Sequence, residues 1–178
     1  MTVLDCDLVG FTGKAETMTP EDVAAGLSLF RSLVEEAVFE QDGAVLAHVG
    51  DGTVCLFGLR DDSDKSPEKA IACALTLLRH WNERARSLFS DEPPPLAIGI
   101  DFGLAAIGLV GEDRSLSLLA TGAPVDGAAS LQQATRFWKT CLLISERAWA
   151  RLDSTPEMAV FEPCKQSGVG VLRLVAWD

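Results

Sequence analysis

Apolar and polar residues alternate along the chain with two different periods, which predict a regular series of strands and helices. Residues 2–9 combine apolar and β-branched side chains and stop at Gly10, a pattern typical of a strand. Thr19 and Pro20 then form a helix start, since threonine is a favoured N-cap and proline is tolerated in the first turn. The apolar stripe that follows has helical spacing and ends before Gly43; it comprises Val23, Leu27, Phe30, Val34 and Val38.

The next segments repeat the pattern with two short strands, a helix and a further strand. Residues 44–49 and 53–58 predict a β-hairpin, because Gly50-Asp51-Gly52 between them is a tight-turn signal. A second helical stripe is formed by Ile71, Leu75, Leu78 and Trp81. A strand over Ile98–Phe102 completes the order β-α-β-β-α-β, which is the ferredoxin-like or split βαβ arrangement.

The C-terminal part of the chain extends this core. A glycine-dotted stretch, Gly103–Gly111, leads to a short strand at 116–121, and a third helix begins near Pro124. The last third predicts a strand, a short helix and two strands that end at Val171–Trp177. We therefore expect an α/β (α+β) fold with a ferredoxin-like split βαβ core and a C-terminal α/β extension. Residues 1–178 form a single domain in this interpretation, one module of a longer protein.

Composition restricts the compartment and the partners. The net charge of −11 repels nucleic acid and anionic membranes. Apolar runs such as Ile71–Leu78 are far shorter than the roughly 18 residues that cross a bilayer. Five scattered cysteines without a C-x-x-C pair indicate reduced thiols rather than a disulfide or zinc framework. We expect a cytoplasmic protein with no nucleic-acid partner and no direct membrane insertion.

Three aspartates suggest a metal site. Asp5 and Asp7 lie two residues apart on a strand, so both side chains point to one face, and Asp51 lies at the hairpin tip. In a split βαβ fold the first strand and the hairpin are neighbours, so Asp7 and Asp51 are expected to meet around a hard cation such as Mg²⁺ or Mn²⁺. The turn Leu8–Thr12 offers backbone N–H groups for phosphate. Alternatively, Asp51 is only a turn residue, and Asp5 and Asp7 are the solvated face of an edge strand.

Several motifs stand in a fixed order along the chain. They are Asp7-Leu8-Val9-Gly10-Phe11-Thr12, Thr19-Pro20-Glu21, Val49-Gly50-Asp51-Gly52 with Phe57-Gly58, Ile98-Gly99-Ile100-Asp101-Phe102-Gly103, Gly108-Leu109-Val110-Gly111 and Gly122-Ala123-Pro124-Val125. Each motif is short, but the ordered set resembles the catalytic domain of class III adenylate and guanylate cyclases over nearly the whole chain.

This resemblance implies a specific chemistry. The family forms dimers, usually head-to-tail, in which the ribose 3′-OH of ATP or GTP attacks the α-phosphate and pyrophosphate leaves. Two metal ions, Mg²⁺ or Mn²⁺, would be held by Asp7 and Asp51, with the Leu8 carbonyl as a further ligand. The backbone N–H groups of Gly10, Phe11 and Thr12 would bind the phosphates.

The substrate side departs from the family pattern. The lysine four residues before the second metal aspartate is replaced by Ala47, and the base-selecting polar residue by Leu119. Asp126 stands where the family has the ribose-orienting asparagine, and Ser130 where it has the transition-state arginine. The catalytic residues therefore stay unknown. Arg114 is a candidate nucleotide-binding replacement, although its polar loop equally suits a solvated side chain.

Several functions remain open at this point. The losses favour a homodimer that is weak or inactive and acts in intracellular signalling. They also suit a non-catalytic regulatory module that dimerises and binds nucleotide or metal, or the metal-bearing half of a heterodimeric cyclase. A weak homodimeric cyclase that uses Arg114 or Asp126 in new roles is a further alternative. A polymerase-like palm shares the fold and the two-metal chemistry, but the glycine motifs after residue 98 favour a cyclase.

Overall fold

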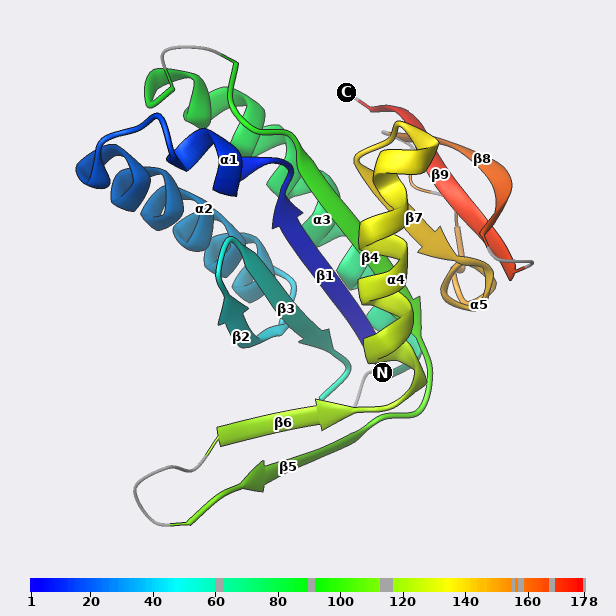
Figure 1. Ribbon diagram of the computed structural model, residues 1–178. Coiled ribbons are helices and arrows are strands. Elements are labelled where there is room, and N and C mark those ends of the chain that lie inside the picture. The colour runs from blue at the N-terminus through cyan, green and yellow to red at the C-terminus, as the bar shows by residue number, and fades with distance from the viewer. Residues whose placement is uncertain are drawn as a thin grey trace.

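A mixed seven-stranded sheet with the order β2-β3-β1-β4-β7-β9-β8 runs through the protein (Figure 1). The computed structural model describes residues 1–59, 63–89, 92–112, 117–154, 156, 159–166 and 169–177. Along the sheet the strands are β2 (Ala44–Val49), β3 (Gly52–Phe57), β1 (Thr2–Leu8), β4 (Leu96–Phe102), β7 (Leu142–Ser145), β9 (Val169–Trp177) and β8 (Ala159–Gln166). The first four strands have the order of a split βαβ fold, so this part of the prediction is confirmed.

Two long helices cover one face of the sheet and a third covers part of the other (Figure 1). Helices α2 (Pro20–Glu40) and α3 (Ser66–Arg84) pack their apolar stripes on the main core. Thr19 caps α2 as predicted, because its hydroxyl oxygen accepts a hydrogen bond of 3.2 Å from the Asp22 backbone N–H. Helix α4 (Ala123–Trp138) lies on the opposite face, against β4 and β1.

Helix α4 can approach β4 closely because Gly99 has no side chain. A Cβ at this position would overlap the carbonyl oxygen of Ala128 and the backbone nitrogen of Gln132. Glycine is therefore required by the packing distance and not by its backbone angles. This contact fixes the height of the last turns of α4 above the sheet, and those turns carry residues of the candidate site.

Strand β1 divides its side chains between the two faces. Leu4, Cys6 and Leu8 are fully buried in the main core beneath α2 and α3. The alternate residues, which include Asp5 and Asp7, therefore face the side on which α4 lies. The hydrophobic period of the strand thus determines where its carboxylates point.

A separate two-stranded sheet extends away from the body of the protein (Figure 1). It consists of β5 (Ala106–Val110) and β6 (Ser117–Thr121), paired antiparallel. The sequence predicted the second strand, but treated the stretch that forms β5 only as a connection. Arg114 lies between the two strands and outside the described residues, so its predicted nucleotide contact stays a prediction.

The remaining elements are short. They are α1 (Phe11–Ala15), α5 (Glu146–Trp149) and the 3₁₀ turns η1 (Ser63–Lys65) and η2 (Ala85–Ser87). Beyond β4 and the β5–β6 hairpin, the chain continues as α4, β7, α5, β8 and β9, which confirms the predicted α/β extension. Among the described ranges, none of the helices has the length and apolar character needed to cross a membrane.

Candidate metal and nucleotide site

Asp7 and Asp51 are brought to the same edge of the sheet by the pairing of β1 with β3. Asp7 lies opposite Gly52 in this antiparallel register, and Asp51 is the residue immediately before Gly52 in the turn. The turn is made by Gly50, whose φ of 61° is readily adopted only by glycine. The sequence prediction that these two carboxylates meet is consistent with this register.

Burial and neighbouring charges act on the carboxyl groups of Asp7 and Asp5. Burial raises the pKa of Asp7, and the negative charge of Asp51 raises it further. The Arg136 guanidinium and a hydrogen bond from the Leu8 backbone oppose this rise. Burial, followed by the charge of Asp7, raises the pKa of Asp5 to about 6. Such a cluster of acids is stabilised by a positive charge between them.

The donor atoms suit a magnesium or manganese ion. Carboxylate oxygens of Asp7 and Asp51 are hard ligands, and the Leu8 carbonyl follows directly on the same strand. In the described part of the chain, no three histidine, cysteine or acidic side chains gather into a complete metal cage. The remaining ligands would therefore be backbone oxygens, water and nucleotide phosphates, which is how Mg²⁺ is commonly bound.

The turn between β1 and α1 adjoins these carboxylates. Gly10 adopts the left-handed conformation with φ 74°, and the buried Phe11 anchors the turn in the core. The Thr12 hydroxyl donates a hydrogen bond of 3.4 Å to Asp51 Oδ2. Thr12 therefore links the predicted phosphate turn to the predicted metal ligand.

Two residues of α4 that the sequence analysis did not predict also reach Asp7. Gln132 Nε2 donates to Asp7 Oδ2 over 3.5 Å, and Arg136 Nη2 lies 3.6 Å from the same oxygen. Because the two residues are four positions apart, they lie on one helical face. Their spacing was visible in the sequence, but its meaning depends on how α4 crosses the sheet.

Comparisons with known proteins agree with this geometry. The profile of the family described as adenylate and guanylate cyclase catalytic domain matches residues 1–135. The chain belongs to this family. It is 28% identical to adenylate cyclase 1 of Rhizobium meliloti over 188 residues, a match that covers 98% of the chain and 28% of that protein. The chain thus spans less than a third of the length of the curated relatives that it matches first.

Solved structures show the same class III cyclase fold. The guanylyl cyclase Cya2 has a TM-score of 0.82 at 21% identity, with 99% of this chain and 92% of that one covered. The adenylyl cyclase CyaB from P. aeruginosa has a TM-score of 0.83 at 19% identity, with 99% and 94% covered. One of these neighbours is a guanylyl cyclase and the other an adenylyl cyclase, so the fold alone does not select a base.

The four positions where the sequence analysis expects changed substrate-side residues take no part in the contacts just described. Asp126 and Ser130 are exposed and four residues apart on α4, and the Leu119 side chain is half exposed on β6. Ala47 is partly buried on β2. The described side-chain partners of Asp7 and Asp51 are instead Thr12, Gln132 and Arg136.

His48, beside Ala47 on β2, is held within its own subunit. Its Nδ1 lies 2.8 Å from the Thr53 hydroxyl, and its Nε2 lies 3.4 Å from Glu35 Oε1. Both ring nitrogens of His48 thus have polar partners within the same chain.

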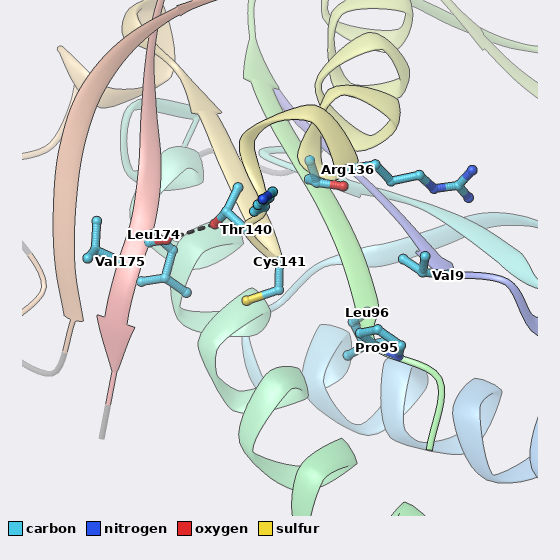
Figure 2. A pocket seen from close by; sticks show the side chains of 10 residues that line it. Val9, Pro95, Leu96, Arg136, Thr140, Cys141, Leu174 and Val175 are labelled. Carbon is cyan, nitrogen blue, oxygen red and sulfur yellow. Dashed lines mark hydrogen bonds between the residues drawn. The ribbon is translucent and has the colours of Figure 1, made fainter. Parts of the chain in front are cut away.

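A pocket of about 380 Å³ lies at the C-terminal end of α4 (Figure 2). Its lining residues are Val9, Pro95, Leu96, Thr135, Arg136, Lys139, Thr140, Cys141, Leu174 and Val175. The Thr140 hydroxyl donates to the Leu174 carbonyl over 2.7 Å, and burial raises the pKa of Cys141 to about 11. The pocket is therefore lined by the neutral thiol of Cys141 and by the Thr140 hydroxyl, which already donates to Leu174. Arg136 also lines the pocket, and its side chain extends away from these residues.

Proposed function

We propose that this domain supplies the metal-binding half of a nucleotidyl cyclase site for ATP or GTP and that its substrate-binding half is impaired. The arrangement of Asp7 and Asp51 at one sheet edge carries the proposal. The four changed substrate-side residues support the second part, since a symmetric dimer would repeat the same losses in both of its sites.

The reaction converts a nucleoside triphosphate to a cyclic nucleotide. The ribose 3′-oxygen forms a bond to the α-phosphorus, the bond to the bridging oxygen of the β-phosphate breaks, and the hydroxyl proton is lost as pyrophosphate leaves. Two divalent ions, when bound, supply nucleophile activation and charge neutralisation. Asp7 and Asp51 would hold them, with the Leu8 carbonyl as a further ligand, and Thr12 would orient Asp51. Gly10, Phe11 and Thr12 would bind phosphate oxygens through backbone N–H groups.

The missing substrate contacts should reduce the rate strongly. Ser130 cannot provide the charge of a transition-state arginine, which is worth about 10³–10⁵ in rate in phosphoryl transfer. Removal of one preorganised hydrogen-bond donor costs about 10²–10³. Asp126 keeps an acceptor but adds a negative charge near a polyphosphate. Losses within one site do not simply add, yet the homodimer is expected to be weak or inactive.

The β5–β6 hairpin supports a dimer. Its apolar side chains are exposed along both strands: Ile107, Leu109, Val110, Leu118 and Leu119. Several exposed apolar side chains on one short hairpin are typical of a protein–protein interface. We propose a head-to-tail dimer, formed with a second copy of this chain or with a complementary cyclase subunit. In this dimer, α4 of one subunit lies near Asp7 and Asp51 of the other.

The proposed cellular setting is cytoplasmic signalling. Cys6, Cys55, Cys73, Cys141 and Cys164 are all free thiols. Free cysteines are typical of a reducing compartment.

The decisive experiment separates the two halves of the site. The purified protein would be assayed with Mn²⁺ and ATP or GTP, alone and mixed with a cyclase subunit that keeps the lysine, asparagine and arginine but lacks its own metal aspartates. We expect little cyclic nucleotide from the homodimer and clear product from the mixture. Asp51→Asn should abolish that product, whereas Asp42→Asn, an exposed acid elsewhere, should not.

A non-catalytic regulatory module is the second candidate, favoured by the loss of all four substrate-side groups. It predicts a dimer that binds nucleotide or metal but forms no product with any complementary subunit. Robust product formation by the unmixed homodimer would contradict both candidates.

A further inference from the structure

Arg136 forms an ion pair with Asp7, a proposed metal ligand. Its Nη2 atom lies 3.6 Å from Asp7 Oδ2, and Gln132 Nε2 lies 3.5 Å from the same oxygen. The Arg136 side chain is 58% exposed, while that of Asp7 is 23% exposed. Asp7 is thus held by strand β1, whereas the long Arg136 side chain is largely exposed and has room to move.

The Arg136 side chain points toward the proposed metal site and away from the inner part of the neighbouring pocket. Figure 2 shows its side chain extending away from Thr140, Cys141 and Leu174, on the side where Val9 lies. Val9 directly follows the Leu8 carbonyl and precedes the Gly10 turn. The guanidinium therefore lies beside the segment proposed to bind both the ions and the phosphates.

The net charge around Asp7 and Asp51 changes from negative to positive when divalent ions bind. Without them, Asp7 and Asp51 repel each other, and the guanidinium offsets part of that repulsion. With divalent ions on the two carboxylates, the contact between Arg136 and Asp7 becomes an unfavourable approach of like charges. A triphosphate brought by the ions would at the same time offer the guanidinium several acceptor oxygens.

We propose that Arg136 is a positioning cation with two alternative partners, Asp7 in the empty site and the triphosphate of a bound nucleotide in the loaded site. This inference rests on the proposed metal site. It adds a phosphate contact from the same subunit as the metal aspartates, in a chain that lacks the transition-state arginine at Ser130.

The test measures two affinities that should change in opposite directions. Mn²⁺ binding would be followed by the electron paramagnetic resonance of the free ion, and binding of ATP or GTP by calorimetry at saturating Mn²⁺. Arg136→Ala should bind Mn²⁺ about three- to tenfold more tightly, because a competing charge is gone. It should bind the nucleotide about 10- to 100-fold more weakly, because a charge-assisted phosphate contact is lost.

Two further variants serve as controls. Arg136→Lys keeps the charge but not the planar fork, so it should lie between wild type and alanine in both measurements. Lys139→Gln removes a positive charge from the same end of α4 and should change both affinities less than about twofold. Circular dichroism and a thermal melt confirm that each variant is folded.

The outcomes distinguish this inference from the proposed function. A folded wild-type protein that binds no Mn²⁺ would overturn the proposed metal site and the inference together. Mn²⁺ binding that Arg136→Ala leaves unchanged or weakens would overturn only the inference. Nucleotide affinity that is unchanged in Arg136→Ala would also overturn it, because the second partner would then be absent.

Discussion

Asp7 lies opposite Gly52 across the antiparallel pair of β1 and β3, and the space left by this glycine adjoins the Asp7 carboxylate. A Cβ at position 52 would be 3.4 Å from Asp7 Oδ1 and 3.3 Å from the carbonyl oxygen of Cys6. The hairpin thus places Asp51 at the proposed metal site and leaves space beside the Asp7 carboxylate. Both features depend on the same short sequence, Gly50-Asp51-Gly52.

Gly52→Ala tests whether this clearance matters for metal binding. The added methyl group would crowd the Cys6 carbonyl oxygen and touch the Asp7 carboxylate. It should therefore shift this part of β1 slightly and weaken Mn²⁺ binding by about two- to tenfold, which corresponds to roughly 0.4–1.4 kcal/mol. The measurement is a Mn²⁺ titration of folded protein. Gly108→Ala on β5 is the matched control, because nothing lies within 4 Å of the added methyl. Equal Mn²⁺ affinities for the two variants would contradict the steric role of Gly52.

Asp5 should reduce the stability of the metal-free fold at neutral pH. Burial and Asp7 raise its pKa from 3.8 to about 6, so the folded state holds the proton more tightly than the unfolded chain does. Ionisation above pH 6 therefore costs folding free energy, and this cost disappears as the pH falls from 6 to 4. Asp5→Asn should stabilise the protein by about 2 kcal/mol at pH 7.5 and hardly at all at pH 4.

The measurement is urea unfolding in the presence of EDTA at several pH values. Asp42→Asn, at a well-exposed acid, provides the reference, and its effect on the free energy of unfolding should not vary in the same way. If Asp5→Asn changed the free energy of unfolding by the same amount from pH 4 to pH 7.5, folding would not raise the pKa of Asp5, and the prediction would be wrong.

The sequence predicted the parts of this protein that depend on local patterns. The strand period of residues 2–9 and the glycines around Asp51 were sufficient to predict that Asp7 on β1 lies beside the turn that carries Asp51. The contact of Arg136 with Asp7 was missed because it joins residues 129 positions apart through the packing of α4 on β4. Strand β5 was missed because its sequence does not alternate apolar with polar residues, and every residue of the strand is exposed.

An ion pair between the buried Asp101 and the half-exposed Arg147 was also missed, and it offers a test of the fold. Asp101 is 2% exposed, and its Oδ1 accepts from Arg147 Nε at 2.5 Å and from the Phe102 backbone N–H at 2.8 Å. Arg147→Ala leaves this carboxylate without its counter-charge and should destabilise the protein by about 2–3 kcal/mol. This is less than for a fully buried pair, because the Arg147 side chain is 49% exposed.

A double-mutant cycle checks the origin of that loss by chemical denaturation. Adding Asp101→Asn to Arg147→Ala should recover part of the stability, since the unpaired charge is removed while an acceptor for the backbone is kept. Arg151→Ala, whose ion-pair partner Asp64 is 94% exposed, should cost less than about 1 kcal/mol. Strictly additive effects of the two substitutions at positions 101 and 147 would contradict the coupling.

Restoring the substrate side should convert the homodimer into an active cyclase. The change combines Ala47→Lys, Asp126→Asn and Ser130→Arg, which replace three of the four departures with the family residues and leave Leu119 unchanged. Positions 126 and 130 lie on the exposed face of α4, so their replacements should not disturb the core. If the metal half works as proposed, cyclic nucleotide formation with Mn²⁺ should rise by at least about 10³, mainly through the restored arginine.

Two controls make the restoration specific to two-metal chemistry. Ser130→Lys in the same background should recover less activity, because lysine lacks the planar fork that matches phosphoryl oxygens. Asp51→Asn added to the restored protein should remove the gained activity, because the ions would lose a ligand. A restored protein that folds, dimerises and binds nucleotide but gains less than about tenfold would place the defect in the metal half. The proposal that this chain supplies working metal ligands would then be wrong.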